Sequence, residues 1–319
     1  MRIVPQRLTI RCPALIAAVL AAALMALSPA WSQQAGNGRL KVVASFSILA
    51  DLVKNVGGER VDVAALVGPN GNAHVYAPSP ADAKKVADAR IVFVNGLGFE
   101  GWLDRLVKAS ATTAPIIVAS RGVKPLERAG AHAQDSDHDH GEHGNADPHA
   151  WQSVANAKIY VENIRDALIG IDPAGKAAYD SQASAYIAKL NALDREVHDA
   201  MAKVPADRRR VITSHNAFGY FQSAYGIGFI APQGVSTEAE ASARDVAAII
   251  GEIRKQKAAA VFLENVTDPR LIQQIARETG AKVGGVLYSD ALTDASGDAP
   301  TYIDLMRHNL KQLANALTS

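Results

Sequence analysis

The stretch LKVVASFSILADLVKNVGGERVDVAALV, residues 40–67, decides the fold class of this chain. It begins and ends with apolar runs of strand length, Leu40–Ser45 and Val61–Val67. Continuous apolar runs are typical of parallel strands that are covered on both faces. The residues between the two runs follow a helical pattern, so the stretch predicts a strand, a helix and a second strand.

The same alternation continues to the C-terminus. Six further strands are predicted, at Arg90–Asn95, Pro115–Ala119, Arg210–Ser214, Ile227–Ala231, Ala259–Glu264 and Lys282–Leu287. Helix signals stand between them: Ser79 precedes Pro80, and Asp268 precedes Pro269 in a segment that ends at Gly280. Four strands in each half, separated by helices, predict two α/β lobes.

A long amphipathic helix is expected between the lobes. From Asp172 to Pro205 the apolar residues recur at spacings of three and four. About 30 helical residues span roughly 45 Å, enough to join both lobes rigidly and to limit their relative motion. The predicted organisation is an N-terminal lobe over residues 39–171, a linking helix over 172–205 and a C-terminal lobe over 206–319.

Residues 1–32 are predicted to be a secretory signal peptide. Arg2, Arg7 and Arg11 precede an apolar run from Pro13 to Leu27, and small residues that suit signal peptidase follow near residues 30–32. The alternative is a membrane anchor, but a run of about 15 apolar residues is shorter than the ~20 that cross a bilayer. We therefore expect cleavage near residues 30–32 and a periplasmic protein.

Composition narrows the functions open to the exported chain. Removing three of the 33 Lys and Arg residues and none of the 32 Asp and Glu residues leaves a net charge of −2, which does not favour binding to nucleic acid. The single cysteine, Cys12, lies within the signal. A metal site in the exported chain must therefore consist of histidines and carboxylates.

Potential metal ligands follow several predicted strands. His74 follows the second strand, His215 ends the fifth, Asp290 follows the eighth, and His149 stands in Asp-Pro-His-Ala-Trp151. Ligands of open parallel sheets bind beyond the carboxyl ends of the strands, so one site between the lobes could use all four residues. Three imidazoles and a carboxylate suit Zn²⁺, and imidazole also suits Cu, Ni and Fe. Solvated or capping roles for single loop histidines remain open from spacing alone.

The segment 129–147 is rich in histidine and acidic residues. His138, His140 and His143 are clustered there among Gly, Ala, Ser and Asn, and the segment has little to bury. We expect a loop that gathers metal as an auxiliary element, with a solvated linker as the alternative.

Four motifs resemble the signatures of the metal-specific solute-binding proteins of ABC transporters, the ZnuA-like group of the cluster A-I (cluster 9) family. They are GNAHVYAPSPAD at residues 71–82, DPHAW at 147–151, TSHNAFGY at 213–220 and YSDAL at 288–292. The motifs occur in the family's order, and the likeness extends from about residue 40 to the C-terminus. The resemblance implies two (β/α)₄ lobes joined by one long rigid helix. It also implies a metal site between the lobes, formed by His74, His149, His215 and Asp290.

The resemblance further implies a transport function. A protein of this group captures its ion in the periplasm and delivers it to a membrane permease that works with a cytoplasmic ATPase. We expect Zn²⁺ as the transported ligand, because manganese-type members tend to carry Glu at the position of His215. A Mn²⁺- or Fe²⁺-binding member of the same family is the alternative. We also expect a monomer, and a separate metal chaperone is a possible further partner.

Two other classes compete with this interpretation. A secreted zinc hydrolase would keep an open coordination position for water, and the sequence has neither HExxH nor GxSxG. We therefore expect no enzymatic activity. A structural zinc protein is the other rival, and it would not give up its ion. Glu264, at the end of the seventh strand, is a candidate acceptor behind one of the ligands, with a surface or capping role as the alternative.

Overall fold

The first four predicted strands form one parallel sheet in the computed structural model, which describes residues 38–127, 146–239, 241–256 and 258–318. The strands are β1 (Leu40–Phe46), β2 (Val61–Val67), β3 (Ile91–Val94) and β4 (Ile116–Val118), in the order β2-β1-β3-β4. Val42 of the central strand pairs with Val63 on one side and Ile91 on the other. The central strand is buried from Val42 onward, which explains its unbroken apolar run.

The second sheet repeats this arrangement. It consists of β5 (Arg210–Ile212), β6 (Gly228–Ile230), β7 (Ala260–Glu264) and β8 (Val283–Leu287), in the order β6-β5-β7-β8, and all pairs are parallel. The predicted class of two α/β lobes with parallel four-stranded sheets is thus confirmed. Several strands are shorter than the apolar runs, since the ends of those runs enter the loops that carry the candidate site.

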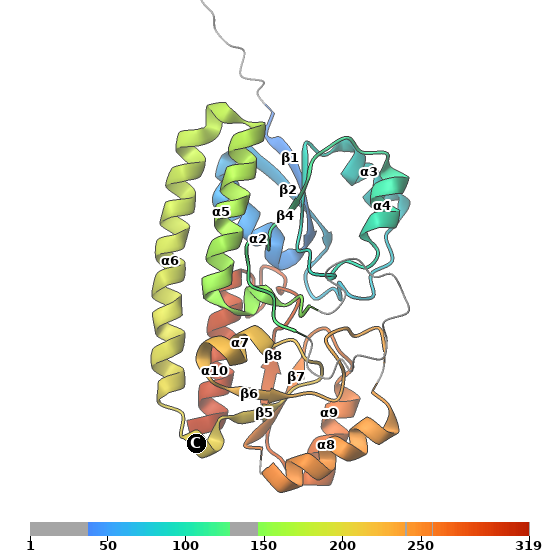
Figure 1. Cartoon of the computed structure of the whole chain (residues 1–319), viewed down its shortest axis with the longest axis vertical. Coiled ribbons are helices and arrows are strands. Elements are labelled where there is room, and N and C mark those ends of the chain that lie inside the picture. Colours follow the sequence, from blue (N-terminus) through green and yellow to red (C-terminus); the bar gives the residue numbers. More distant parts are fainter. Residues whose placement is uncertain (1–37, 128–145, 240, 257, 319) are drawn as a thin grey trace, which may run out of the picture. The chain divides into compact units, whose positions relative to one another are not determined.

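Helices cover both sheets and separate the strands (Figure 1). They are α2 (Ser47–Gly57), α3 (Pro80–Asp88), α4 (Leu103–Ser110), α5 (Val154–Ile171), α6 (Lys176–Ala202), α7 (Gly219–Tyr225), α8 (Ala243–Gln256), α9 (Pro269–Thr279) and α10 (Tyr302–Thr318). The predicted signals mark their ends. Ser79 forms a capping box with Asp82 at the start of α3, while Asp268 caps α9 and Gly280, at φ 71°, ends it.

The long helix α6 follows the predicted linker but is slightly shorter. A 3-10 turn, η4 (Pro173–Gly175), precedes it, and the helix itself has 27 residues, about 40 Å in length. The N–H of Gly175 donates to the carbonyl of Asp172, which closes this turn before the α-helix begins. Helix α6 contacts α2 and α5 on the side of the first lobe and α7 and α10 on the side of the second, so it runs beside both (Figure 1).

The main hydrophobic core is shared by both lobes. It joins residues of β1, β3, α2 and α5 to residues of α6, α7 and α10 in one cluster. A second, smaller cluster lies in the C-terminal lobe between the sheet and α8 and α9, around Ile212, Ile253 and Ile272. The two sheets are therefore not independently packed units.

Some predictions fall outside the described residues. The signal peptide over 1–32 is one, and the auxiliary histidines His138, His140 and His143 are another. The proposed boundaries between lobes and linker also stay predictions. Within the described part of the chain, none of the helices combines the length and apolar character needed to cross a membrane.

Candidate metal centre

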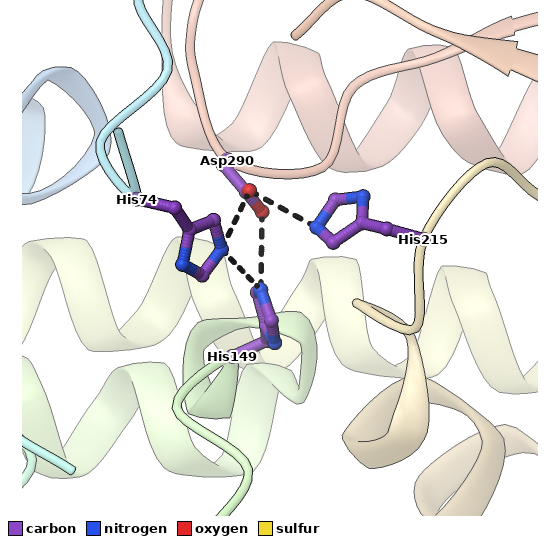
Figure 2. A group of neighbouring side chains, drawn as sticks. All are labelled: His74, His149, His215 and Asp290. Carbon is purple, nitrogen blue, oxygen red and sulfur yellow. Dashed lines mark hydrogen bonds and ion pairs between the residues drawn. The ribbon is translucent and has the colours of Figure 1, made fainter. Parts of the chain in front are cut away.

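The structure brings His74, His149, His215 and Asp290 into one group (Figure 2). Each residue offers one potential ligand atom, and these atoms all lie within 4.8 Å of one another. The residues arrive from four separate loops, which follow β2, precede the short turn η3 (Ala150–Gln152), follow β5 and follow β8. Two come from each half of the chain; His74, His215 and Asp290 follow strands as predicted, whereas His149 precedes η3 and follows no described strand directly.

The three imidazoles present their Nε2 atoms to one another and to the carboxylate. Nε2 of His74 lies 3.2 Å from Nε2 of His149 and 3.3 Å from Oδ2 of Asp290. The same Oδ2 atom is 3.1 Å from Nε2 of His215, and Oδ1 is 3.5 Å from Nε2 of His149. Donors placed 2.0–2.2 Å from a central ion in a tetrahedron stand roughly 3.3–3.6 Å apart. These four separations thus suit one small cation in the middle of the group, and the remaining pairs lie within 4.8 Å.

The group is withdrawn from solvent. His149, His215 and Asp290 are fully buried, and His74 is only 4% exposed. Burial lowers the pKa of His74, so this imidazole is neutral near pH 7 and its Nε2 atom can donate a lone pair. A buried cluster of this kind needs either internal pairing or a bound cation to offset the loss of hydration.

Asp290 and His215 form an ion pair within the group. Burial alone would raise the pKa of Asp290, but the facing rings of His215 and His149 outweigh it and hold this pKa well below its usual range. Burial alone would likewise lower the pKa of His215, but the carboxylates of Glu264 and Asp290 raise it well above 6.5. In the metal-free protein, His215 therefore carries a proton that an incoming cation must displace.

His74 is positioned through its backbone. Its N–H donates to Oδ1 of Asn72 at 3.0 Å, and Nε1 of Trp102 donates to the carbonyl of Ala73 at 2.7 Å. The ring itself makes an edge-to-face contact with Phe99, with centroids 4.8 Å apart. The loop after β2 is thus fixed at the two residues that precede the histidine.

His149 is oriented by Asp147. Oδ1 of Asp147 accepts the backbone N–H of His149 at 2.9 Å and lies 2.8 Å from Nδ1 of its ring. A proton on Nδ1 would satisfy this contact and leave Nε2 free to bind. The neighbouring carbonyl of Pro148 accepts Nδ2 of Asn95 at 2.9 Å, which attaches this loop to the end of β3.

Glu264 contacts His215 in the same way that Asp147 contacts His149. Oε1 accepts the backbone N–H groups of Ser214 and His215 at 2.6 and 2.9 Å, and Oε2 lies 2.6 Å from Nδ1 of His215. The structure therefore places Glu264, the predicted acceptor, against the ring and not at the surface. Carboxylates that accept the second ring N–H of a ligating histidine fix its tautomer and raise its basicity.

Contacts between the lobes fix the loop of Asp290. The carbonyl of Ser289 accepts Nε1 of Trp151 at 3.0 Å and Nε2 of Gln152 at 2.8 Å. The N–H of Leu292 donates to Oγ of Ser47 at the start of α2. Residues next to His149 thus hold the backbone next to Asp290, and the two halves of the group are coupled directly.

Three functional neighbours are not singled out by the sequence reasoning: Asp147, Phe99 and Trp102. Asp147 has a local signal, because an acid two residues before a histidine can accept both its N–H and its ring N–H. Phe99 packs against the ring of His74 and Trp102 donates to the carbonyl of Ala73, and both contacts depend on the tertiary structure, which no local spacing indicates.

Comparisons with known proteins place this architecture in a family. Residues 42–316 match the model of the family ZnuA, described as zinc-uptake complex component A, periplasmic. The chain is 34% identical to the iron-binding protein YfeA of Yersinia pestis and 33% identical to the manganese-binding lipoprotein MntA of Halalkalibacterium halodurans. These matches cover 86% of both chains for YfeA, and 88% of this chain and 89% of the relative for MntA.

A solved structure shows the same fold. The periplasmic zinc-binding protein TroA of Treponema pallidum superposes with a TM-score of 0.79 at 28% identity, over 88% of this chain and 99% of that one. The names of these relatives refer to three different metals, so they do not determine the metal of this chain. Since the family model spans nearly the whole described chain, the protein belongs to the ZnuA family of metal-binding components of ABC transporters.

Proposed function

We propose that this protein is a periplasmic solute-binding protein that captures Zn²⁺ and delivers it to an ABC transporter permease. His74, His149, His215 and Asp290 are the proposed ligands of the transported ion. One observation carries the assignment: four buried potential donors converge with the spacing of a small tetrahedral site.

The hydrogen bonding of the group supports a bound cation. Nε2 of His215 and both carboxylate oxygens of Asp290 are buried, and although Nε2 of His215 and Oδ2 of Asp290 form an ion pair at 3.1 Å, none of the three atoms has a well-aligned hydrogen bond to a described residue. Buried polar atoms are nearly always satisfied, and unsatisfied ones need an explanation. Figure 2 shows these atoms facing the two other rings, so one cation between them would satisfy the whole set.

The donor set favours Zn²⁺ over Mn²⁺ or Fe²⁺. Three imidazoles, neutral once the ion has displaced the proton of His215, and one carboxylate give a nitrogen-rich site, and exchanging a carboxylate for an imidazole moves affinity away from Mn²⁺. The alternative has its own support. The relatives include proteins named for iron and manganese, and both oxygens of Asp290 face the group, which would allow a fifth donor.

Capture for transport fits the group better than catalysis or a structural role. A catalytic zinc uses three protein ligands and a water, whereas this group supplies four protein donors and is almost fully buried. A structural zinc would be released only on unfolding. Reversible binding to a protein that stays folded without metal separates transport from a structural role, and assays for zinc-dependent hydrolysis test the remaining class.

The deciding experiment is elemental analysis of the untagged protein from its native periplasm, followed by competition titration. We expect about one zinc per chain and tight, reversible binding. His215→Ala should abolish tight binding, and His198→Ala should not, because His198 is a half-exposed histidine on α6. Unchanged affinity and stoichiometry in His215→Ala would show that the ligand assignment is wrong. Manganese or iron in the native protein would establish the alternative metal.

The other partners follow from membership of the family. Delivery requires a membrane permease and its ATPase, and a metal chaperone is a further proposed partner. We propose that His138, His140 and His143 gather metal without belonging to the main site. Deleting residues 132–144 should then remove only weaker binding, and loss of tight binding would contradict this separation.

A further inference from the structure

One of the four proposed ligands borders the protein surface. His74 lines a surface cavity of about 260 Å³ together with Val75, Tyr76, Gly101, Trp102, Arg105 and Glu238. The other three members of the group are fully buried, so His74 alone separates this cavity from the interior of the group. A larger cavity of about 440 Å³ lies beside α9 and contains none of the four residues. The smaller cavity is thus lined by a member of the group itself, whereas the larger one is lined by Ser214, the residue before His215.

His74 is also the least constrained ring of the three. A carboxylate holds Nδ1 of His149 and another holds Nδ1 of His215, at 2.8 and 2.6 Å. For Nδ1 of His74, no described residue serves as a hydrogen-bond partner. Its ring contacts are the two other imidazoles, Asp290 and the edge-to-face contact with Phe99. A ring attached on one side only can rotate at less cost than the two anchored rings.

The cavity contains one carboxylate that does not belong to the group. Glu238 comes from the second lobe, whereas the other lining residues belong to the first. It is exposed, so its carboxylate is hydrated and can meet a cation arriving from solvent. Arg105, on the opposite lobe, is a cation in the same cavity and would repel one.

We infer that the metal ion enters and leaves through this cavity, with His74 as the ligand that swings aside and Glu238 as the first acceptor of the hydrated ion. The inference rests on the proposed function, since it concerns the same centre. It assigns the order of events: Glu238 binds the ion at the surface, the His74 ring rotates, and the two anchored histidines with Asp290 receive the ion. Glu238 thus controls the rate of exchange without being a ligand of the bound ion.

The first test obstructs the cavity without touching a ligand. A Cβ atom added at Gly101 would meet nothing within 4 Å, so Gly101→Leu can be accommodated with its side chain in open space at the cavity. Gly170→Leu is the matched control, because Gly170 on α5 is also exposed with open space around its Cβ position and does not line the cavity. Stopped-flow measurements of Zn²⁺ association, and of its dissociation into excess chelator, give both rates.

For Gly101→Leu we expect association and dissociation to slow by the same factor, about tenfold or more, at an unchanged equilibrium affinity. An obstructed path alters both rates together, because it raises one barrier and leaves the bound state as it was. Gly170→Leu should match the unmodified protein. Unchanged rates in Gly101→Leu would overturn the path.

The second test concerns charge. Glu238→Gln should slow association and dissociation alike, by about fivefold, and Arg105→Gln should speed association. Glu162→Gln, an exposed residue of α5, makes the same change in net charge far from the cavity in sequence and fold, and it should have no effect. Equal slowing in Glu162→Gln would mean a general effect of net charge. A rise in the dissociation rate of Glu238→Gln would make Glu238 a ligand of the bound ion. Either result rejects its role as first acceptor.

Motion of His74 can be observed directly. In metal-free protein with ¹⁵N-labelled histidine, we expect exchange broadening of the His74 ring on the microsecond to millisecond timescale and sharp signals from His149 and His215. Equal exchange broadening, or equal sharpness, of the three histidine ring signals would show that His74 is not the ligand that rotates. An unmodified protein that binds no metal at equilibrium would instead reject the proposed function itself, so the two failures are distinguishable.

Discussion

Asp147 and His149 are joined twice, because one carboxylate oxygen accepts the backbone N–H of His149 at 2.9 Å and lies 2.8 Å from Nδ1 of its ring. The residue between them is proline, which restricts the backbone between the two side chains. The orientation of this proposed ligand is therefore a local property of three consecutive residues.

Asp147→Ala is expected to weaken metal affinity by about 10- to 100-fold, because the ring of His149 loses its fixed orientation and its favoured tautomer. Competition titration measures the change. The variant keeps all four proposed ligands, so its stoichiometry should remain one ion per chain. An affinity equal to that of the unmodified protein would show that the carboxylate is dispensable.

Gly219→Ala also tests the carboxylate of Asp147, because it adds a Cβ atom next to that carboxylate. A Cβ atom at position 219 would stand 2.5 Å from Oδ2 of Asp147, so the carboxylate or the start of α7 must move. We expect weaker metal binding in the direction of Asp147→Ala, although alanine is the better helix former. Gly251→Ala in α8, where a Cβ atom meets nothing within 4 Å, should leave affinity unchanged. If Gly219→Ala bound metal with normal affinity, the carboxylate of Asp147 would not be in contact with position 219.

Metal binding should release a proton from His215. Because the carboxylates of Glu264 and Asp290 raise the pKa of His215 well above 6.5, its ring is protonated in the metal-free protein at pH 7. Binding must release about one proton, and affinity should fall as the pH is lowered. Calorimetry in two buffers of different ionisation enthalpy measures the number released. Glu264→Gln should reduce that number, and no release at pH 7 in the unmodified protein would contradict the ion pair.

Asp51 should make stability depend on pH. Burial raises its pKa from 3.8 to about 6, against hydrogen bonds from the N–H of Tyr302 and from Asn55. The folded protein then holds this proton more tightly than the unfolded chain does. The contribution of Asp51 is therefore most favourable below pH 4, declines as the pH rises through 6, and is constant above it.

Asp51→Asn removes this dependence while an amide oxygen can still accept from Tyr302. We expect the variant to be more stable than the unmodified protein at pH 7, by about 1–3 kcal/mol, with a smaller difference at pH 4.5. Denaturant unfolding at both pH values gives the comparison. Asp62→Asn, an exposed site on β2, should show no such difference. A greater loss of stability at pH 7 than at pH 4.5 in Asp51→Asn would reverse the assigned sign.

Sequence patterns predict much of this fold because the parallel strands are unbroken apolar runs. Val42 and Val43 in β1 are buried in the way their run indicates. The start of α6 is less predictable, since Pro173–Gly175 form a 3-10 turn that follows Asp172. The carboxylate of Asp172 also pairs with Arg60, which ends the 3-10 turn η2 (Gly58–Arg60) far away in the sequence. Helix ends that depend on such long-range partners cannot be located from spacing alone.

The candidate centre also combines features that the sequence predicts with features that depend on long-range contacts. Positions after strand ends indicated that His74, His215 and Asp290 would converge, because sheet topology brings those ends together. The contact of Glu264 with His215 follows from the pairing of neighbouring strands β5 and β7. The cavity beside His74 depends on residues of both lobes, including Glu238, and no sequence pattern records which side of a centre stays open.

Scattering measurements should detect little change in size when the ion binds. Helix α6 contacts elements of both lobes, and the main core continues from one lobe into the other. Wide closure would have to disrupt this packing, so a local rotation of the His74 ring is the expected response. A change in the radius of gyration of several per cent on adding zinc would contradict it.

The shared core has a consequence for the lifetime of the protein in the cell. An ion bound among the four loops stabilises the folded chain by mass action, and the continuous core transmits that stabilisation to both halves. Proteases would then meet either a wholly protected chain or a wholly vulnerable one. The steady-state amount of this protein would therefore rise and fall with the supply of its metal, even at a constant rate of synthesis.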